Sequence, residues 1–452
     1  MNVDEGTLMD SGVPVVVVGA GPVGLAAAAH LVERGLDPVV LEAGDQVGAA
    51  VRQWRHVRLF SPWGELIDDA AARLLESAGW DRPDPASYPT GEDWAERYLE
   101  PLAKTLGERV RLGTRVVGVA RRGRDRIVDA GRESEPLTVH TLGVDGIEGR
   151  ITARAVIDAS GTWGTPNPLG GDGLSAIGEH AAASRITYRV PDFSDERVAS
   201  RYRGRHVAVV GSGHSALTAL VALTSLSLSP STHVTWVLRR SQVGNVFGGD
   251  QADALAARGA LSQRARAVVE EGQVDIVTGF RTAAVERKDN DTLILVSDDG
   301  RRVDDLDEVV VLTGFRPDLS WLSEIRLDLD ASLQAPVALA PLIDPNVHSC
   351  GSVPPHGAAE LAHRERGFYL VGMKSYGRAP TFLALTGYEQ VRSVVAEIAG
   401  DREAAARVDL QLPETGVCGG SGLFEESGQA QSDGCCAAPQ VIRLTAPSLI
   451  SR

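Results

Sequence analysis

The chain has 452 residues, an apolar fraction of 43% and a formal net charge of −15 at pH 7. Its length suggests roughly three domains, and its apolar fraction allows each domain a buried core. The acidic balance argues against a nucleic-acid-binding protein and against a protein that binds anionic membranes, because both need a basic surface.

One apolar run, from Val13 to Val32, is long enough to cross a bilayer by hydropathy. Three glycines and a proline interrupt it, and the residues before it are acidic where a secretory signal would be basic. We therefore interpret the run as a buried strand, a glycine turn and a buried helix. We expect a cytoplasmic protein that neither crosses nor binds a membrane.

A strand, a glycine-rich turn, a helix and a second strand follow one another from Val13. The run Val13–Val18 is typical of a central parallel strand, and Leu25–Arg34 has the pattern of a helix. Between them lies Gly19-Ala-Gly21-Pro22-Val-Gly24, and a second strand, Pro38–Leu41, ends in Glu42. In this pattern the first glycine permits a tight turn, the second lets a pyrophosphate approach, and the third lets helix and strand pack closely. Glu42, about twenty residues on, is placed to hydrogen-bond ribose hydroxyls, so we expect a bound dinucleotide.

The residues that follow predict further helices and a small antiparallel sheet. Trp54 and Trp63 bound a tryptophan-rich segment, and we expect Trp54 either to flank a cofactor or to lie in the core. The other expected elements are a helix at Trp94–Leu106, alternating strands at Val110–Val119 and Leu137–Leu142, and a strand at Ala155–Ala159.

A second unit of the same kind begins after a connection rich in glycine, proline and alanine at Pro166–Asp195. Strand His206–Val210 leads into Gly211-Ser212-Gly213-His214-Ser215-Ala216, then a helix at Leu217–Leu226 and a strand at Val234–Leu238 that ends in Arg239-Arg240. A carboxylate at this strand end would repel a 2′-phosphate, whereas guanidinium groups bind it in a bidentate manner. The second fingerprint therefore favours NADPH over NADH; the alternative is that the two arginines only form a solvated strand end.

Strands at Val309–Val311 and Phe368–Val371 and a long helix at Thr381–Ile398 indicate that the chain then returns to its first unit. The predicted fold class is α/β, with two Rossmann-like dinucleotide-binding domains, the second inserted into the first. The expected boundaries are 13–170 and 331–400 for an FAD-binding domain, 171–330 for an NADPH-binding domain and 401–452 for a tail with little core. Two such domains suggest that FAD is held permanently and that NADPH visits it and donates a hydride.

Two further stretches complete a family pattern. Asp158-Ala-Ser-Gly161-Thr precedes the second domain, and Thr313-Gly-Phe-Arg-Pro-Asp318 follows it. With the paired fingerprints, they make residues 13–400 resemble the class B flavin-dependent monooxygenases, which include the flavin-containing and Baeyer–Villiger monooxygenases. The resemblance implies a monooxygenase-like oxidoreductase with FAD in the first domain, in contact with Gly161, and NADPH in the second. The chain departs from the family pattern at Gly178–Tyr188, where Ser184 stands in place of the usual histidine and His180 is out of register.

A narrower resemblance is to the monooxygenase-like flavoproteins of bacterial arsenic-resistance operons. It rests on Trp54…Leu59-Phe-Ser-Pro-Trp63, on Gly372-Met-Lys374-Ser-Tyr376-Gly-Arg378 and on the cysteines of the tail. In flavoproteins with paired dinucleotide domains, the helix after such a loop faces the flavin. This implies cofactor contacts for Gly372 and Thr381 and catalytic roles for Lys374 and Tyr376.

Three of the four cysteines, Cys418, Cys435 and Cys436, lie in the tail. Soft thiolates suit soft acceptors such as trivalent arsenic, which makes all three candidate metal or metalloid ligands. The vicinal pair Cys435-Cys436 is also a candidate catalytic dithiol that exchanges electrons with the flavin or a small thiol. The alternative is a tail whose cysteines do little.

Three hypotheses follow from these patterns. The first is an NADPH-dependent FAD oxidoreductase, monooxygenase-like, that acts in arsenic resistance or in metalloid and thiol detoxification, with arsenite or a thiol adduct as its small-molecule substrate. The second is a flavin-linked disulfide or metalloid reductase that uses Cys435-Cys436. The third is an arsenite-binding protein whose flavin domains are a scaffold. The oligomeric state stays open, with a homodimer as one alternative.

Overall fold

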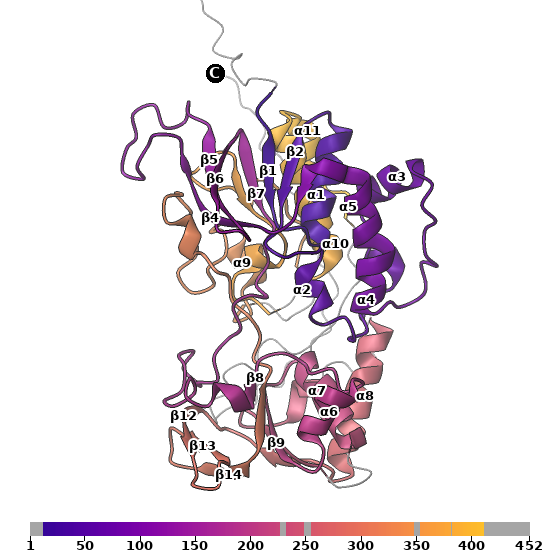
Figure 1. The fold of residues 1–452 in the computed structure, drawn as a ribbon, viewed down its shortest axis with the longest axis vertical. Helices are drawn as coiled ribbons and strands as arrows, with labels where there is room; N and C mark the ends of the chain where they lie inside the picture. The colour runs from indigo at the N-terminus through magenta and orange to yellow at the C-terminus, as the bar shows by residue number, and fades with distance from the viewer. Residues whose placement is uncertain (1–11, 227–231, 248–254, 348–352, 381, 411–452) are drawn as a thin grey trace, which may run out of the picture.

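The computed structural model describes residues 12–226, 232–247, 255–347, 353–380 and 382–410. These residues form two α/β lobes that lie one above the other in Figure 1, joined by thin chain connections. Segments from both ends of the described chain, in indigo and yellow, build the upper lobe, whereas the lower lobe comes from the middle of the chain. One domain is therefore inserted into the other, as the sequence predicts.

A parallel sheet with strand order β16-β7-β1-β2-β3 forms the centre of the upper lobe. β1 (Val15–Val18) consists of four buried valines, and β-branched residues of this kind are typical of a strand covered on both faces. It lies between β2 (Pro38–Leu41) and β7 (Ala155–Asp158), with β3 (Val110–Arg111) at one edge. β16 (Phe368–Leu370) pairs with β7, so the chain returns to its first sheet after building the lower lobe.

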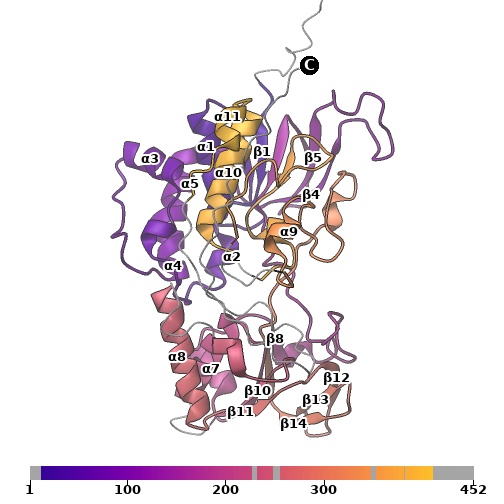
Figure 2. The same ribbon diagram turned by 180° about the vertical axis from the view of Figure 1, so that it is seen from behind.

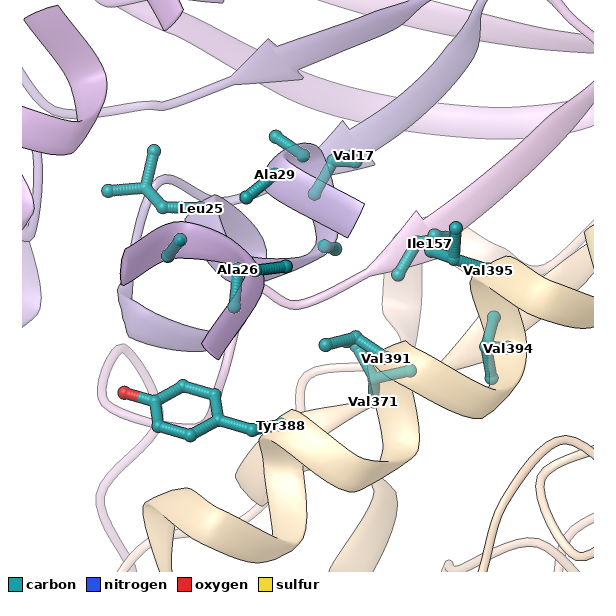
Figure 3. Packing of buried hydrophobic residues seen from close by; sticks show 14 of the residues in the cluster. Val17, Leu25, Ala26, Ala29, Ile157, Val371, Tyr388, Val391, Val394 and Val395 are labelled. Atoms are coloured by element: carbon teal, nitrogen blue, oxygen red, sulfur yellow. The ribbon is translucent and has the colours of Figure 1, made fainter. Parts of the chain in front are cut away.

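Two helices and a second sheet cover the opposite faces of this parallel sheet. α1 (Pro22–Glu33) and α10 (Ala384–Ile398) share one buried cluster with β1, and Figure 3 shows Ala26 of α1 and Val391 of α10 within it. The other face packs against an antiparallel sheet of β4 (Thr114–Arg121), β5 (Leu137–Gly143) and β6 (Glu148–Ala153).

Two sequence predictions in this lobe need correction. The single strand expected at Val110–Val119 is split between β3 and β4, because Gly113 adopts a φ of +61° and turns the chain between the two sheets. The helix expected at Trp94–Leu106 starts earlier and is interrupted by a π-helical turn. Pro101 has no N–H to donate to the preceding turn, which accounts for that interruption. The segment consists of α4 (Gly91–Trp94), η2 (Ala95–Leu99) and α5 (Glu100–Leu106).

Short helical segments complete the upper lobe. They are α2 (Ala49–Arg52), η1 (Trp63–Glu65), α3 (Asp69–Ser77), η3 (Gly107–Arg109), η8 (Ser320–Leu322), α9 (Ala340–Ile343), η9 (Gly372–Tyr376) and α11 (Arg402–Ala406).

The lower lobe repeats the design around a second parallel sheet, with strand order β11-β10-β9-β15-β8. Seen from behind in Figure 2, α7 and α8 lie on one side of this lobe and β12, β13 and β14 on the other. The sheet consists of β8 (Ile186–Thr187), β9 (His206–Val210), β10 (His233–Val237), β11 (Asp275–Val277) and β15 (Glu308–Val311). The antiparallel strands are β12 (Thr282–Arg287), β13 (Leu293–Ser297) and β14 (Arg302–Leu306). The helical segments are η4 (Ala183–Arg185), α6 (Glu196–Tyr202), α7 (His214–Ser225), η6 (Gly244–Phe247) and α8 (Ala256–Glu270).

This architecture confirms the predicted fold class of two Rossmann-like domains, one inserted into the other. The domain boundaries stay predictions. Both fingerprint helices begin earlier than expected, α1 at Pro22 and α7 at His214, because the last residues of each glycine pattern already adopt helical geometry. Within the described residues, no helix has the length and apolar character needed to cross a membrane.

Candidate cofactor-binding and active site

The first glycine fingerprint joins β1 to α1, and glycine suits each of its three positions for a different reason. Gly19 adopts a φ of +98°, and an added Cβ would lie 2.8 Å from the carbonyl oxygen of Ala159. At Gly24 a Cβ would lie 2.0 Å from the carbonyl oxygen of Gly19, so close packing of helix on strand requires glycine. A Cβ on Gly21 would meet no atom of the described residues within 4 Å. Gly21 therefore borders open space, as the approach of a pyrophosphate requires.

The two fingerprint helices begin without a side-chain cap from any described residue. α1 starts after Gly21 with Pro22 at its first position, and α7 starts after Gly213. Asp68 caps α3 and Asp195 caps α6, each accepting a hydrogen bond from a backbone N–H of the first turn, whereas α8 and α10 also begin without a side-chain cap from the described chain. The N–H groups of a first helical turn and the positive end of the helix dipole favour an anion at α1 and α7. These features fit the diphosphates of FAD and NADPH.

Glu42 lies at the carboxyl end of β2, next to the first fingerprint. It is half-buried, and its two carboxylate oxygens accept hydrogen bonds from the backbone N–H groups of Ala20 and Gly44, each at 2.8 Å. A carboxylate offers about four acceptor positions, so capacity remains for ribose hydroxyls. The geometry thus agrees with the ribose contact expected for Glu42.

The second fingerprint has the same construction in the lower lobe. Gly211 adopts a φ of +129°, and a Cβ there would lie 2.3 Å from the carbonyl oxygen of Leu312, which follows β15. Gly213, like Gly21, borders space in which no described atom lies within 4 Å of an added Cβ. Ala216 is fully buried in α7 and takes the place of the third glycine. Ser212, His214 and Ser215 form the rest of the turn and the first positions of α7.

Arg239 and Arg240 follow directly after β10 and Leu238. Burial lowers the pKa of Arg239, and the neighbouring guanidinium of Arg240 lowers it further, so this strand end favours the approach of an anion. Arg239 also donates to the carbonyl oxygen of Gly171 at 3.3 Å. The arrangement suits a 2′-phosphate, and this assignment stays a prediction.

Replacing Arg239 and Arg240 together by alanine tests that assignment. We expect KM for NADPH to rise about 10- to 100-fold and KM for NADH to change little, because charge-assisted contacts of this kind contribute about 1.5–3 kcal/mol. Steady-state oxidation of the two nucleotides measures both values, and Arg287→Ala, in an exposed ion pair on β12, is the control. An equal loss with both nucleotides would mean that the arginines only maintain the strand end.

The tryptophan-rich segment lies where the two lobes touch. Trp54 is half-buried and packs on the core of the upper lobe, with its ring centroid 6.3 Å from that of Trp94, so its core interpretation has direct support. Phe60 crosses to the lower lobe, where its ring lies edge-on to His214 with centroids 5.4 Å apart. This contact brings the upper lobe against the second fingerprint. Sequence reasoning missed Phe60, because nothing in its local pattern marks a contact between domains.

The loop at Gly372–Tyr376 forms η9, against the carboxyl end of β7. Gly372 adopts a φ of +66° and donates its N–H to the side chain of Gln390 at 2.7 Å. Lys374 is only 1% exposed, and its Nζ lies 2.7 Å from a carboxylate oxygen of Asp158, which is fully buried. The structure thus places Lys374 in a buried ion pair, and the catalytic role implied by the resemblance stays a prediction.

The other predicted residues of this region are partly described. The ring of Tyr376 is buried against Phe382, with centroids 4.9 Å apart, and burial raises the pKa of its hydroxyl, which keeps it protonated. Gly161, three residues after the end of β7, adopts a φ of +68° and borders open space within the described chain. The remaining predicted site residues, Thr381, Cys418, Cys435 and Cys436, lie outside the described residues.

The stretch that departs from the monooxygenase pattern has a structural role. Gly178 adopts a φ of +84°, and a Cβ there would lie 2.2 Å from the carbonyl oxygen of Val285. The buried carboxylate of Glu179 accepts hydrogen bonds from the backbone N–H of Ala176 and from the hydroxyl of Tyr188, at 2.7 and 2.5 Å. Tyr188 therefore stabilises the turn through Glu179, and Ser184 has no part in that pair.

A cavity of about 520 Å³ lies away from both fingerprints, beside the antiparallel sheet of the upper lobe. The buried guanidinium groups of Arg121 and Arg132 share the carboxylate of Glu365, at 2.7 and 2.6 Å, and backbone carbonyls accept from their remaining N–H groups. These donors are already satisfied, so the cluster stabilises the fold and offers nothing for a substrate to pair with.

Replacing Glu365 by glutamine is expected to lower the free energy of unfolding by about 3–5 kcal/mol, because two guanidinium groups would stay buried without a carboxylate. Burial raises the pKa of Glu365, but hydrogen bonds from Arg132 and Arg121 outweigh it, so the pKa is lowered overall. Its stabilisation is therefore present above the unfolded pKa of about 4.3 and is lost as pH falls through the lower folded value. Urea unfolding at neutral and acid pH measures both effects. The control, Glu133→Gln, removes an exposed pair with Arg366 and should change neither.

Comparison with known proteins gives a family match over most of the chain. A family model described as pyridine nucleotide-disulphide oxidoreductase matches residues 16–339. Over 165 residues the chain is 28% identical to the digeranylgeranylglycerophospholipid reductase of Methanosarcina mazei, a match that covers 32% of this chain and 40% of that protein. The match therefore spans less than half the length of that relative.

Two solved structures share most of the fold. The bacillithiol disulfide reductase of Bacillus cereus superimposes with a TM-score of 0.63 at 19% identity, over 86% of this chain and 98% of that chain. The flavin-containing monooxygenase of Stenotrophomonas maltophilia gives a TM-score of 0.55 at 22% identity, with the same coverage. At these identities the likeness is one of fold, and it extends to flavin monooxygenases and to disulfide reductases alike.

Proposed function

The chain belongs to the pyridine nucleotide-disulphide oxidoreductase family and is a flavoprotein oxidoreductase that uses FAD and NADPH, and we propose that it transfers electrons from NADPH to a soft substrate, a trivalent arsenical or a thiol adduct. The observation that carries the cofactor assignment is the pair of open, uncapped glycine turns, one in each parallel sheet. The substrate class rests on the resemblance to arsenic-resistance flavoproteins and on the tail cysteines. We place the reaction in the cytoplasm, where NADPH is available.

Each fingerprint has a separate task in this proposal. Gly21 and the start of α1 receive the diphosphate of FAD, while Glu42 orients its ribose. Gly213, the start of α7 and the Arg239-Arg240 pair bind NADPH. Bound FAD supplies the chemistry that accepts a hydride and passes electrons on. The contact between Phe60 and His214 holds the nucleotide turn against the FAD domain.

NADPH oxidation with and without arsenite, in air and in its absence, tests the leading proposal. An oxygenating reaction consumes NADPH, one proton and O2, inserts one oxygen atom into the arsenical and releases water. We therefore expect arsenite to accelerate NADPH oxidation only in air and to lower peroxide release. Peroxide formation unaffected by arsenite would contradict arsenite as the substrate. An absence of NADPH turnover by the FAD-loaded protein would contradict the proposed oxidoreductase function itself.

The likeness in fold to a disulfide reductase supports a second candidate, a flavin-linked disulfide or metalloid reductase. In that reaction NADPH and one proton convert a disulfide into two thiols, so the reaction proceeds without oxygen. The Cys435→Ser, Cys436→Ser double variant should then lose anaerobic turnover, whereas Cys350→Ser should keep it. Full activity in the double variant would remove this candidate. If the tail instead serves only to bind arsenite, the double variant loses arsenite binding and keeps NADPH oxidation.

A further inference from the structure

Lys374 joins three segments that are far apart in the sequence. Its Nζ lies 2.7 Å from a carboxylate oxygen of Asp158 and donates to the hydroxyl of Ser160 at 3.1 Å. The same ammonium lies 4.5 Å from the centroid of the Trp321 ring. The contacts therefore join η9, the end of β7 and η8. The ammonium thus lies against a hydroxyl, a carboxylate and an aromatic face.

Asp158 and Trp321 lie at the base of the two chain connections between the domains. The outgoing connection leaves β7 after Asp158, and the incoming one reaches η8 at Ser320. In between, the two connections run side by side. Asn167 donates its backbone N–H to the carbonyl oxygen of Gly314 at 2.9 Å, and Arg316 donates to that of Thr165 at 3.0 Å.

The rings of Trp163 and Phe315 stack across the same pair of connections, with centroids 4.7 Å apart. Burial raises the pKa of Asp318, but hydrogen bonds from Ser320 and the charge of Lys374 lower it overall. The positive charge of Lys374 thus also favours the ionised carboxylate of Asp318 in the incoming connection.

The loop that carries Lys374 is in turn held by α10. Gln390 is fully buried, accepts from the N–H of Gly372 and donates to the hydroxyl of Ser375 at 2.9 Å. Its amide nitrogen also contacts Nε2 of His356 at 2.8 Å. The loop that carries Lys374 is therefore fixed on the FAD domain, and its ammonium is fixed on the connections.

We propose that Lys374 is a positioning residue that anchors both interdomain connections to the FAD domain and so sets how the NADPH domain meets it. A proton-transfer role would need an ammonium that can reach a reacting group, whereas this one is 1% exposed and lies against Asp158 and Ser160. The inference rests on the proposed function for its kinetic consequence only. Its structural consequence, ordered connections, can be measured without nucleotide.

The test compares Lys374→Met with the double variant Asp158→Asn, Lys374→Met, both loaded with FAD. The single variant leaves a buried carboxylate unpaired, and the double variant removes that charge, so stability should recover in the double variant. We expect both variants to keep the wild-type NADPH Kd but to lose about 10- to 100-fold in the rate of flavin reduction at saturating NADPH, as misplacement of reactants predicts. Amide exchange in residues 162–167 and 313–318 should accelerate about tenfold in both.

Two outcomes would overturn the proposal. If the double variant regains both stability and the wild-type reduction rate, Lys374 only neutralises Asp158. Unchanged amide exchange in the two connections of the double variant would show that they are not anchored there. The control, Lys288→Met, removes the surface ion pairs of Lys288 with Asp304 and Asp305 in the lower lobe and should change neither readout. If the wild-type flavin is not reduced by NADPH, the proposed function fails while the exchange measurement still decides the role of Lys374.

Discussion

Replacing Gly21 by alanine is expected to give a folded protein that purifies without its yellow colour. The backbone of Gly21 is extended, with φ −83° and ψ −176°, which alanine adopts without strain. An added Cβ meets no described atom within 4 Å, so the fold accommodates it. The methyl group would occupy the space that the diphosphate of FAD needs. Overpacking of that kind costs about 1–3 kcal/mol, or about 5- to 150-fold in Kd.

Gly213→Ala is the matched variant in the second fingerprint. Gly213 has a φ of −84° and the same open surroundings, so this variant should keep its fold and its FAD but lose NADPH affinity by a similar factor. Flavin absorbance, FAD titration and NADPH titration separate the two losses, and the melting temperature of the apoprotein reports the fold. If both variants lost the same cofactor, or if Gly21→Ala bound FAD as the wild type does, the assignment of the two fingerprints would be wrong.

Both fingerprints could be read from the sequence because their information is local. In each, a buried strand, a glycine turn and a helix follow one another within a short stretch, and the turn chemistry depends on backbone geometry that glycine alone tolerates. The insertion of one domain into the other was also predictable, because a second strand–turn–helix unit interrupts the first before β16 completes its sheet. Strand ends were less accurate, as the split of Val110–Val119 at Gly113 shows.

The roles of charged residues depend on contacts that no local pattern contains. The family resemblance implies a catalytic role for Lys374, which stays a prediction. Its partner Ser160 lies 214 positions away, and the pairing becomes visible only when β16 returns beside β7. Arg121 and Glu365 are separated by 244 positions and form a buried pair in the same way. From the sequence alone, a charged residue in a loop is expected to be exposed to solvent. Its burial depends on tertiary packing, which no local sequence pattern shows.

A large effect on the fold itself is expected from Gly24→Ala. The added Cβ would lie 2.0 Å from the carbonyl oxygen of Gly19 and 3.4 Å from the Cβ of Ala159, so α1 must move away from β1 and from the buried cluster that it shares with α10. Backbone cannot yield as a flexible side chain does, so we place the cost at about 3 kcal/mol or more, the upper end for overpacking. For a domain of this size that corresponds to a fall of about 6–12 °C in melting temperature.

The measurement uses the apoprotein, because bound FAD would add its own binding energy to the apparent stability. Ala216, fully buried at the equivalent position of the second fingerprint, shows that a methyl group is tolerated there. The reverse change, Ala216→Gly, is therefore the control and should cost only about 0.5–1 kcal/mol through backbone entropy. A Gly24→Ala protein that melts at the wild-type temperature would mean that α1 can shift away from β1 without loss of stability. The close approach of helix and strand at the FAD turn would then not be what requires glycine there.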